Sequence, residues 1–129
     1  MKRLRVLFLL IFVFACSDDD GAEVIDIALN GQWILTNVSC FCVFPDPVDF
    51  DLTTLDFVAE RNIVTVSHGG DSSYFREEGT YLYSIEGNRI IMDDGRSYDY
   101  EISENTLSLQ FVDEPNIADD EIGYSLIRN

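Results

Sequence analysis

The stretch GTYLYSIEGNRIIMDDGRSYDYEISENTLSLQFV, residues 79–112, decides the fold. Apolar and polar residues alternate along most of it, a pattern that indicates β-strands with one dry and one wet face. The alternating apolar positions are Tyr81, Tyr83, Ile85, Ile90, Met92, Tyr98, Tyr100, Ile102, Leu107, Leu109 and Phe111. The stretch therefore predicts a meander of antiparallel strands whose apolar side chains share one interior.

The turns of this meander must keep these residues on one face, because a slip of one residue inverts a strand. Two-residue turns at 87–88 and 104–105 satisfy this condition. A three-residue loop at 94–96 also satisfies it, setting Met92 opposite Tyr98, and Gly95 then takes the positive φ of a bulged hairpin. The other predicted pairs are Ile85 with Ile90, Tyr83 with Met92, Ile102 with Leu107 and Tyr100 with Leu109.

Strand-like segments continue on both sides of the meander. They are 32–38, a hairpin of 52–58 and 62–67 around Ala59-Glu60-Arg61, a weak strand at 74–77, and a last strand at 122–128 with Tyr124 and Leu126 facing in. About eight short strands predict an all-β fold, either a small antiparallel up-and-down β-barrel or, as the alternative, a β-sandwich. A last strand paired with the first would leave no free edge.

Trp33 is the only tryptophan and follows Gly31 by two residues at the start of the first strand. We expect it to plug one end of the barrel, with a short helical turn at 24–29 packed nearby. The Gly-x-Trp, the hairpin meander and the closing strand that ends in Arg128 resemble the small lipocalin-like domains of bacterial lipoproteins, over residues 29–129. The resemblance implies that Arg128 packs over Trp33 by a cation–π contact. The Thr-Asp-Tyr motif of full lipocalins is absent, which argues against a roomy cavity.

Residues 1–15 have the layout of a secretory signal peptide, in which a basic start precedes the apolar run VLFLLIFVF at 6–14. That run is too short to span a bilayer, which takes about 20 residues. The sequence Val13-Phe14-Ala15-Cys16 resembles the lipobox of bacterial lipoproteins. The resemblance implies cleavage before Cys16 and acylation of its sulfur; a plain secreted protein with a free Cys16 is the alternative.

Residues 16–28 then form an acidic tether. Its start, Cys16-Ser17 followed by Asp18-Asp19-Asp20, resembles the signal that exports some Gram-negative lipoproteins to the cell surface. The resemblance implies a lipid-anchored protein of the outer membrane that faces the cell exterior. A flexible spacer that carries no export signal is the alternative.

The charge of the chain limits its partners. The sequence has 24 acidic and 8 basic residues, and no lysine follows the signal peptide. Without its first 15 residues the chain keeps five arginines and all 24 acidic residues, which is a net charge of −19. Such a chain is repelled by phosphate backbones and anionic lipid surfaces. We therefore expect no nucleic-acid partner, and a membrane attachment that depends on the lipid.

Cys40 and Cys42 are the cysteines left when Cys16 is acylated. On an extended strand their α-carbons would be about 6.5–7 Å apart, at the edge of what a disulfide tolerates. A disulfide would need a bend there, which Pro45 and Pro47 favour. A local disulfide and a buried thiol pair both remain open, and metal binding is a weaker hypothesis.

The sequence shows no catalytic constellation, so we expect a protein that is not an enzyme and that holds no cofactor. His68 is the single histidine, and the sequence has no nucleophile elbow, phosphate loop or zinc spacing. Two acidic segments, Asp46/Asp49/Asp51 and Asp113/Glu114/Asp119/Asp120/Glu121, are of a type that binds calcium, but they contain no EF-hand pattern, and solvated loops are the favoured interpretation.

Two further features bear on binding. The inner face carries five tyrosines, Tyr81, Tyr83, Tyr98, Tyr100 and Tyr124. They are candidates to line a pocket for a small hydrophobic or amphipathic ligand, although a filled interior is favoured, because eight strands enclose little more space than their side chains fill. The apolar stretch 41–50 is expected to pack against the barrel. The alternative function is a solid-core interaction domain of an outer-membrane complex, with an apolar exterior patch near Leu82, Ile91 or 41–50.

Overall fold

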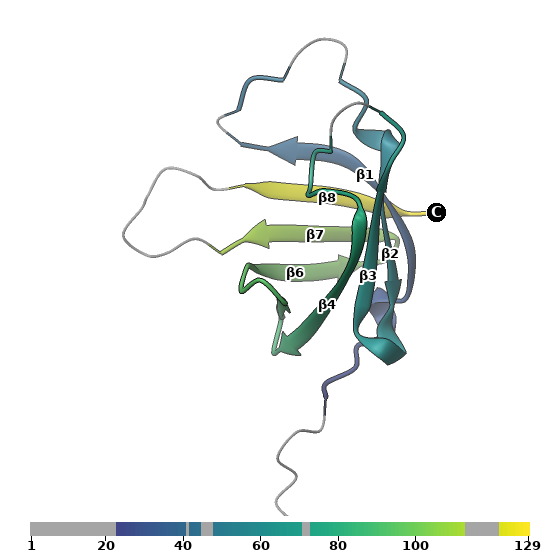
Figure 1. The fold of residues 1–129 in the computed structure, drawn as a ribbon, viewed down its shortest axis with the longest axis vertical. Coiled ribbons are helices and arrows are strands. Elements are labelled where there is room, and N and C mark those ends of the chain that lie inside the picture. The colour runs from purple at the N-terminus through teal and green to yellow at the C-terminus, as the bar shows by residue number, and fades with distance from the viewer. Residues whose placement is uncertain (1–22, 41, 45–47, 71–72, 113–121) are drawn as a thin grey trace, which may run out of the picture.

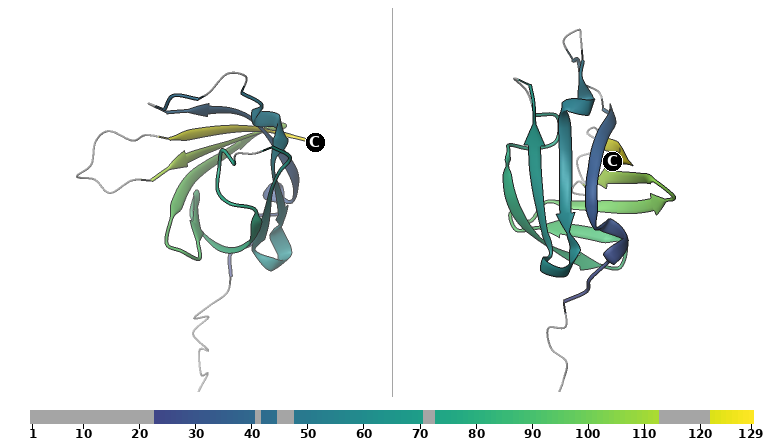
Figure 2. Two further views of the ribbon diagram at one scale, coloured as in Figure 1. Left: turned by 45° about the horizontal axis from the view of Figure 1, so that its top comes forward. Right: turned by 90° about the vertical axis from the view of Figure 1, so that its right-hand side faces the viewer.

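The computed structural model describes residues 23–40, 42–44, 48–70, 73–112 and 122–129. In that part of the chain eight strands form one closed antiparallel barrel, in which each strand pairs with its neighbours in the sequence and the last pairs with the first (Figures 1 and 2). The strands are β1 (Gly31–Ser39), β2 (Thr53–Val58), β3 (Ile63–His68), β4 (Gly79–Glu86), β5 (Arg89–Met92), β6 (Ser97–Ser103), β7 (Thr106–Phe111) and β8 (Gly123–Arg128). The predicted up-and-down barrel is confirmed, and its closure excludes the sandwich.

Alternate residues of every strand fill the interior. One continuous buried cluster includes Trp33, Leu35, Leu55, Phe57, Val64, Val66, Tyr83, Ile85, Ile90, Met92, Tyr98, Leu107, Leu109, Tyr124 and Leu126. Tyr81, Tyr100, Ile102 and Phe111 are partly buried against it. The period of two that is visible in residues 79–112 therefore assigns each side chain of the meander to the correct face.

Two of the three predicted turns have the predicted register. Ile85 lies opposite Ile90, and Ile102 lies opposite Leu107. Both turns use the left-handed conformation that short hairpin loops require, at Gly87 (φ 61°) and Glu104 (φ 56°).

The register between β5 and β6 differs from the prediction. Tyr98 lies opposite Ile90 rather than Met92. The loop is three residues long, as predicted, but it is one residue earlier, because the Met92 amide donates to the Arg96 carbonyl at 2.8 Å. Gly95 has φ 87° within it. The shift displaces the pairing by two residues, and an even shift leaves Met92 and Tyr98 on the interior face.

The strand predicted at 74–77 is wrong. These residues form a bend rather than a strand. Tyr74 packs edge-on against Phe50, with ring centroids 4.9 Å apart, while the next residue, Phe75, packs against Tyr98 at 5.2 Å. Successive strand residues point to opposite faces, so two consecutive aromatic side chains can both pack on the core only where the backbone leaves the strand conformation.

A β-bulge in β1 lets both halves of the strand direct side chains into the barrel interior. The pairing of β1 with β8 shifts between Leu35 and Asn37, so Leu35 and Val38 are both buried although they are three residues apart. The extra residue, Thr36, uses its hydroxyl to donate to the Ser125 carbonyl at 2.9 Å.

The two ends of the barrel are built differently. The tether end, where the described chain begins, carries the 3-10 helices η1 (Ile27–Leu29) and η3 (Ala59–Arg61) and the short turns at 87–88 and 104–105 (Figure 1). The loop end carries the connections that follow β1, β3, β5 and β7, and includes η2 (Phe50–Leu52). Within the described ranges no helix has the length and apolar character needed to cross a membrane.

Candidate functional site

Trp33 seals the tether end. Its side chain is fully buried, and its indole nitrogen donates to the Leu29 carbonyl of η1 at 2.8 Å. A buried indole needs such a partner for its single donor. The bond therefore ties η1 to the first strand and closes the end of the barrel over the ring.

Arg128 covers the other side of this plug. Its guanidinium carbon lies 4.2 Å from the centroid of the Trp33 ring, and its terminal nitrogens donate to the Asn30 and Ala28 carbonyls at 2.8 and 2.9 Å. Gly31 has φ +111°, and a β-carbon there would lie 3.4 Å from an Arg128 nitrogen. Two physical reasons therefore explain the glycine of the Gly-x-Trp: the backbone conformation at Gly31 favours glycine, and a side chain there would crowd Arg128.

The five candidate tyrosines face inward but separate into groups. Tyr83 and Tyr100 lie toward the tether end, where the Tyr100 hydroxyl donates to Asp26 at 2.6 Å. The Tyr83 hydroxyl is buried and has no hydrogen-bond partner in the described structure. Burial, reinforced by the Asp26 carboxylate, raises the pKa of Tyr83 to about 12. For Tyr100, burial and then the hydrogen bond to Asp26 also raise the pKa.

Tyr98 and Tyr124 lie toward the loop end in an aromatic cluster. The Phe75 ring centroid is 5.2 Å from that of Tyr98 and 5.0 Å from that of Tyr124, and Phe111 lies 5.7 Å from Tyr98. Burial is the main cause that raises the pKa of Tyr124 to about 12, and it also raises the pKa of Tyr98. These two phenols are packed members of the core rather than walls of an open space.

The fifth tyrosine, Tyr81, lines a pocket of about 290 Å³ at the loop end. The other lining residues are Arg76, Glu77, Asp94 and Arg96. Two segments meet there, the bend before β4 and the loop between β5 and β6. The pocket thus combines one aromatic ring, two guanidinium groups and two carboxylates.

Arg76 is the buried group of this pocket. Its side chain is 11% exposed, its guanidinium carbon lies 3.8 Å from the centroid of the Tyr81 ring, and one terminal nitrogen donates to Asp94 at 2.8 Å. The remaining donors, Nε and Nη1, are buried and have no hydrogen-bond partner in the described structure. Buried charged donors without partners are rare, because each loses its hydration without compensation.

Asp94 organises the pocket electrostatically. It accepts the Arg96 amide at 3.0 Å, and this bond, together with the nearby Arg76, lowers the pKa of the Asp94 carboxyl group. The Arg96 guanidinium lies 3.7 Å from the same carboxylate. One ionised aspartate therefore holds two arginines at the mouth of the barrel, above the aromatic cluster.

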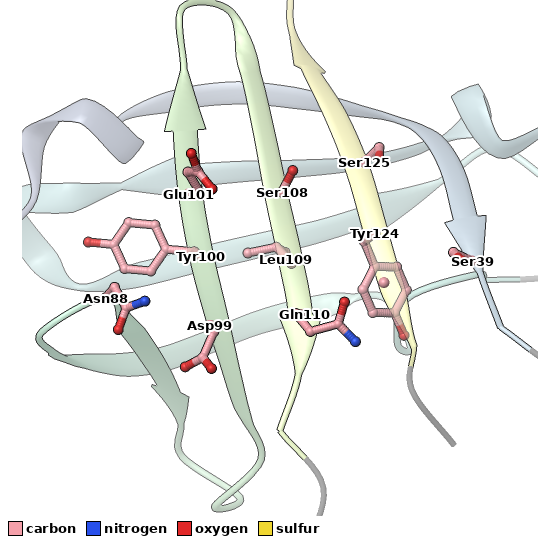
Figure 3. Close-up of a pocket in the computed structure, with 11 residues that line it drawn as sticks. Ser39, Asn88, Asp99, Tyr100, Glu101, Ser108, Leu109, Gln110, Tyr124 and Ser125 are labelled. Atoms are coloured by element: carbon pink, nitrogen blue, oxygen red, sulfur yellow. The ribbon is translucent and has the colours of Figure 1, made fainter. Parts of the chain in front are cut away.

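A second depression, of about 340 Å³, lies on the wall across β6, β7 and β8 (Figure 3). Outward-facing polar residues dominate its lining: Ser39, Asp99, Glu101, Ser108, Gln110 and Ser125. Asp99 is already paired with Arg89 at 2.9 Å. Because none of the unpartnered buried atoms of the described residues lies in it, this depression is a weaker binding candidate than the Arg76 pocket.

The cysteines and acidic segments are only partly described. Cys40 and Cys42 are joined by a disulfide, with α-carbons 5.1 Å apart where the chain bends after β1. Asp49 and Asp51 are exposed. Cys16, Asp46 and the acidic residues at 113–121 lie outside the described ranges. Among the residues that are described, no three histidine, cysteine or acidic side chains form a group that would hold a metal ion.

Sequence reasoning missed the arginines of the loop-end pocket. Arg76 was placed in a strand and Arg96 in a turn, and neither was a candidate binding residue. The one available signal was their rarity, since both belong to the five basic residues that follow the signal peptide. Their convergence on Asp94 depends on a contact between segments 18 residues apart, which no local pattern reveals.

No family model matches the chain, and no curated protein matches it significantly.

Proposed function

We propose that this protein is a lipid-anchored lipoprotein of the outer membrane, facing the cell exterior, whose lipocalin-like barrel binds a small amphipathic ligand at its loop end. The anchor rests on the lipobox-like residues that end in Cys16. The binding role rests on one observation, the buried guanidinium of Arg76 with two donors that have no partner in the described structure. The proposal involves binding and no catalysis.

The chemistry of the pocket supports an acidic head group. A carboxylate or similar anion accepts hydrogen bonds from a guanidinium in a fork, and such charge-assisted bonds are the strong ones. Nε and Nη1 are buried, so a ligand would accept hydrogen bonds from them only after the guanidinium rotates toward the pocket. Tyr81 is the aromatic lining residue and would contact an apolar tail, which places the ligand at the mouth rather than in the packed core.

The anchor is tested by Cys16→Ala. We expect this variant to move from the membrane fraction to the soluble fraction, because the acyl chains would provide most of the membrane affinity. The measurement is fractionation of cells followed by mass spectrometry of the purified protein, with Ser17→Ala as the matched control. A Cys16→Ala protein that stays in the membrane fraction would disprove the acylation proposal.

The ligand class is tested by Arg76→Met. The probe is a fluorescent medium-chain carboxylic acid, compared with its methyl ester. We expect the substitution to weaken binding of the acid about tenfold or more, because hydrogen bonds to charged groups contribute about 1.5–3 kcal/mol. Binding of the ester should change little. The control is Arg89→Met, which removes the same charge from the outer wall, where Arg89 pairs with Asp99.

Equal affinity of the wild-type protein for acid and ester, or no binding of either, would refute the role of Arg76. The free energy of unfolding of both variants is measured alongside, since Arg76→Met also leaves Asp94 without its closest cation.

A second function, an interaction domain of an outer-membrane complex, is favoured by an apolar row on the outer wall. Val58 lies opposite Ile63, and Ile63 lies opposite Leu82. Val58 is 38% exposed and Leu82 is 59% exposed. Three neighbouring strands thus present adjacent apolar side chains to solvent, which is the kind of patch that protein partners cover.

This second function predicts a specific effect of Leu82→Asp. Cross-linking in intact cells should lose a high-mass species that contains this protein, because a charge in the apolar row opposes a partner's apolar surface. Stability should change by less than about 0.5 kcal/mol, as is usual for surface substitutions. Thr80→Asp, on the outer face of the same strand, is the control. Identical cross-linking of the two variants would exclude this function.

A further inference from the structure

The segment that leads into the barrel has an inverted polarity. Its two acidic residues turn toward the barrel: the Asn62 side chain donates to Glu23 at 3.4 Å, and Tyr100 donates to Asp26 at 2.6 Å. Asp26 also accepts the Ala28 amide at 3.0 Å and so caps η1. Asp26 is therefore partly buried and engaged with the protein, while Glu23 stays exposed but contacts Asn62.

The aliphatic residues of the same segment face outward. Val24 is 54%, Ile25 is 46% and Ile27 is 76% exposed, whereas Leu29 is buried. A segment in water gains by placing its apolar side chains inside and its carboxylates outside. The opposite arrangement here indicates that the exposed aliphatic side chains meet an apolar surface in the assembled state.

Further exposed apolar residues lie at the same end of the barrel. Val58, 38% exposed, ends β2 beside η3, which contacts η1. Ile127, 45% exposed, precedes Arg128, whose guanidinium donates to the Ala28 carbonyl. Figure 1 and the right panel of Figure 2 show η1 and η3 together at this end, where the described chain begins. Val58 and Ile127 therefore add exposed apolar side chains at the tether end.

The length of the tether indicates which surface the exposed aliphatic side chains contact. Glu23 lies seven positions after Cys16, and an extended chain spans at most about 3.6 Å per residue, or roughly 25 Å. An acylated Cys16 thus holds this end of the barrel within about the thickness of one leaflet from the lipid. Because Glu23 and Asp26 are hydrogen-bonded to the barrel, the side chains that this segment presents toward the lipid are the aliphatic Val24, Ile25 and Ile27.

We propose that Val24, Ile25 and Ile27 insert into the interfacial region of the bilayer that holds the acylated Cys16, so that the tether end rests on the membrane and the loop end faces away from it. This inference depends on the lipid anchor of the proposed function. Apolar side chains on one face of a short segment bind at this depth, and a neutral bilayer permits it where an anionic surface would repel the chain. The Arg76 pocket would then open toward the medium.

The test uses the mature acylated protein in phosphatidylcholine vesicles. A single cysteine is introduced as Ile27→Cys and labelled with an environment-sensitive fluorophore; Cys16 is acylated and Cys40 is bonded to Cys42, so only the new thiol reacts. Val43→Cys is the matched control, because Val43 is 97% exposed and lies in the connection at the opposite end. Quenching is measured with a nitroxide carried by the lipid and with a quencher dissolved in water.

We expect the label at position 27 to be quenched several-fold more by the lipid-borne nitroxide than the label at position 43, and less by the aqueous quencher. Equal quenching by the lipid-borne nitroxide in acylated, vesicle-bound protein overturns the inference alone. If the label at position 27 is protected from the aqueous quencher but is not quenched by the lipid-borne nitroxide, a protein partner or a second copy covers these side chains. That result also overturns the inference. A purified protein without acyl groups overturns the anchor and this inference together.

Discussion

Replacement of Trp33 by alanine is expected to lower the free energy of unfolding by about 3–5 kcal/mol, the range measured when buried tryptophan or phenylalanine is truncated. The side chain is fully buried at the tether end, and its removal also leaves the Leu29 carbonyl without the indole donor. A domain of this size has a total stability of about 5–15 kcal/mol. The variant should therefore be mostly unfolded at a urea concentration that the wild-type protein tolerates.

The measurement is urea denaturation followed by far-ultraviolet circular dichroism, since the variant has no tryptophan to report by fluorescence. Arg128→Met separates the contributions of the plug. It removes the cation over the ring and the two bonds to Asn30 and Ala28 but keeps the indole, so a smaller loss of about 1–3 kcal/mol is expected. A Trp33→Ala protein within 1 kcal/mol of the wild type would contradict the role of the indole as the seal.

The second large effect is a loss of stability at alkaline pH. The pKa values of Tyr83 and Tyr124 rise from the ordinary 10 to about 12 in the folded protein. Below pH 10 the phenols are neutral in both states and their contribution is fully present. Between pH 10 and about 12 the unfolded chain loses these protons first, so the folded state loses about 2–3 kcal/mol for each tyrosine.

Stability measured by urea denaturation should therefore fall steeply across this pH interval, and phenolate absorbance should appear together with unfolding. Tyr83→Phe is the informative variant. It removes a buried hydroxyl that has no hydrogen-bond partner in the described structure, so stability near neutral pH should be unchanged or higher. The alkaline loss should fall by the share of Tyr83 alone, since the pKa values of Tyr98, Tyr100 and Tyr124 are also raised. Titration of every tyrosine near pH 10 in a folded protein would show that these phenols are accessible to water.

Most of the barrel follows from local patterns. The faces of residues in 79–112 and the two-residue turns depend on neighbours in sequence, so alternation and turn chemistry were sufficient to predict them. The register of β5 against β6 could not be predicted in this way, because shifts of zero and two residues both keep Met92 and Tyr98 inside. The bend at 74–77 was also beyond local reading, since Tyr74 and Phe75 are held by rings from distant segments.

The candidate site was predicted less well than the fold. The five tyrosines were correctly placed on the inner face, but Tyr83 and Tyr98, which are only 5% and 3% exposed, are core residues. Arg76, which carries the binding proposal, gave no signal beyond being one of few cations. Its partner Asp94 and the ring of Tyr81 reach it only when the bend before β4 folds over the loop between β5 and β6.

The sequence by itself determined an all-β fold of about eight short strands with a tryptophan at the first strand, because a period of two and in-phase turns fix which face of each strand is buried. The pairing of β8 with β1 in the tertiary structure decided for the closed barrel over the sandwich. The sequence also determined the strong negative charge and the resemblance to a lipoprotein start. Only the tertiary structure decided which charged and apolar groups lie together: the arginine pair at Asp94, and the outward Val24, Ile25 and Ile27 beside an inward Asp26. The contacts of Arg76 with Asp94 and of Tyr100 with Asp26 join residues that are distant in sequence. Their geometry depends on strand tilt and on loop packing, which no periodicity encodes.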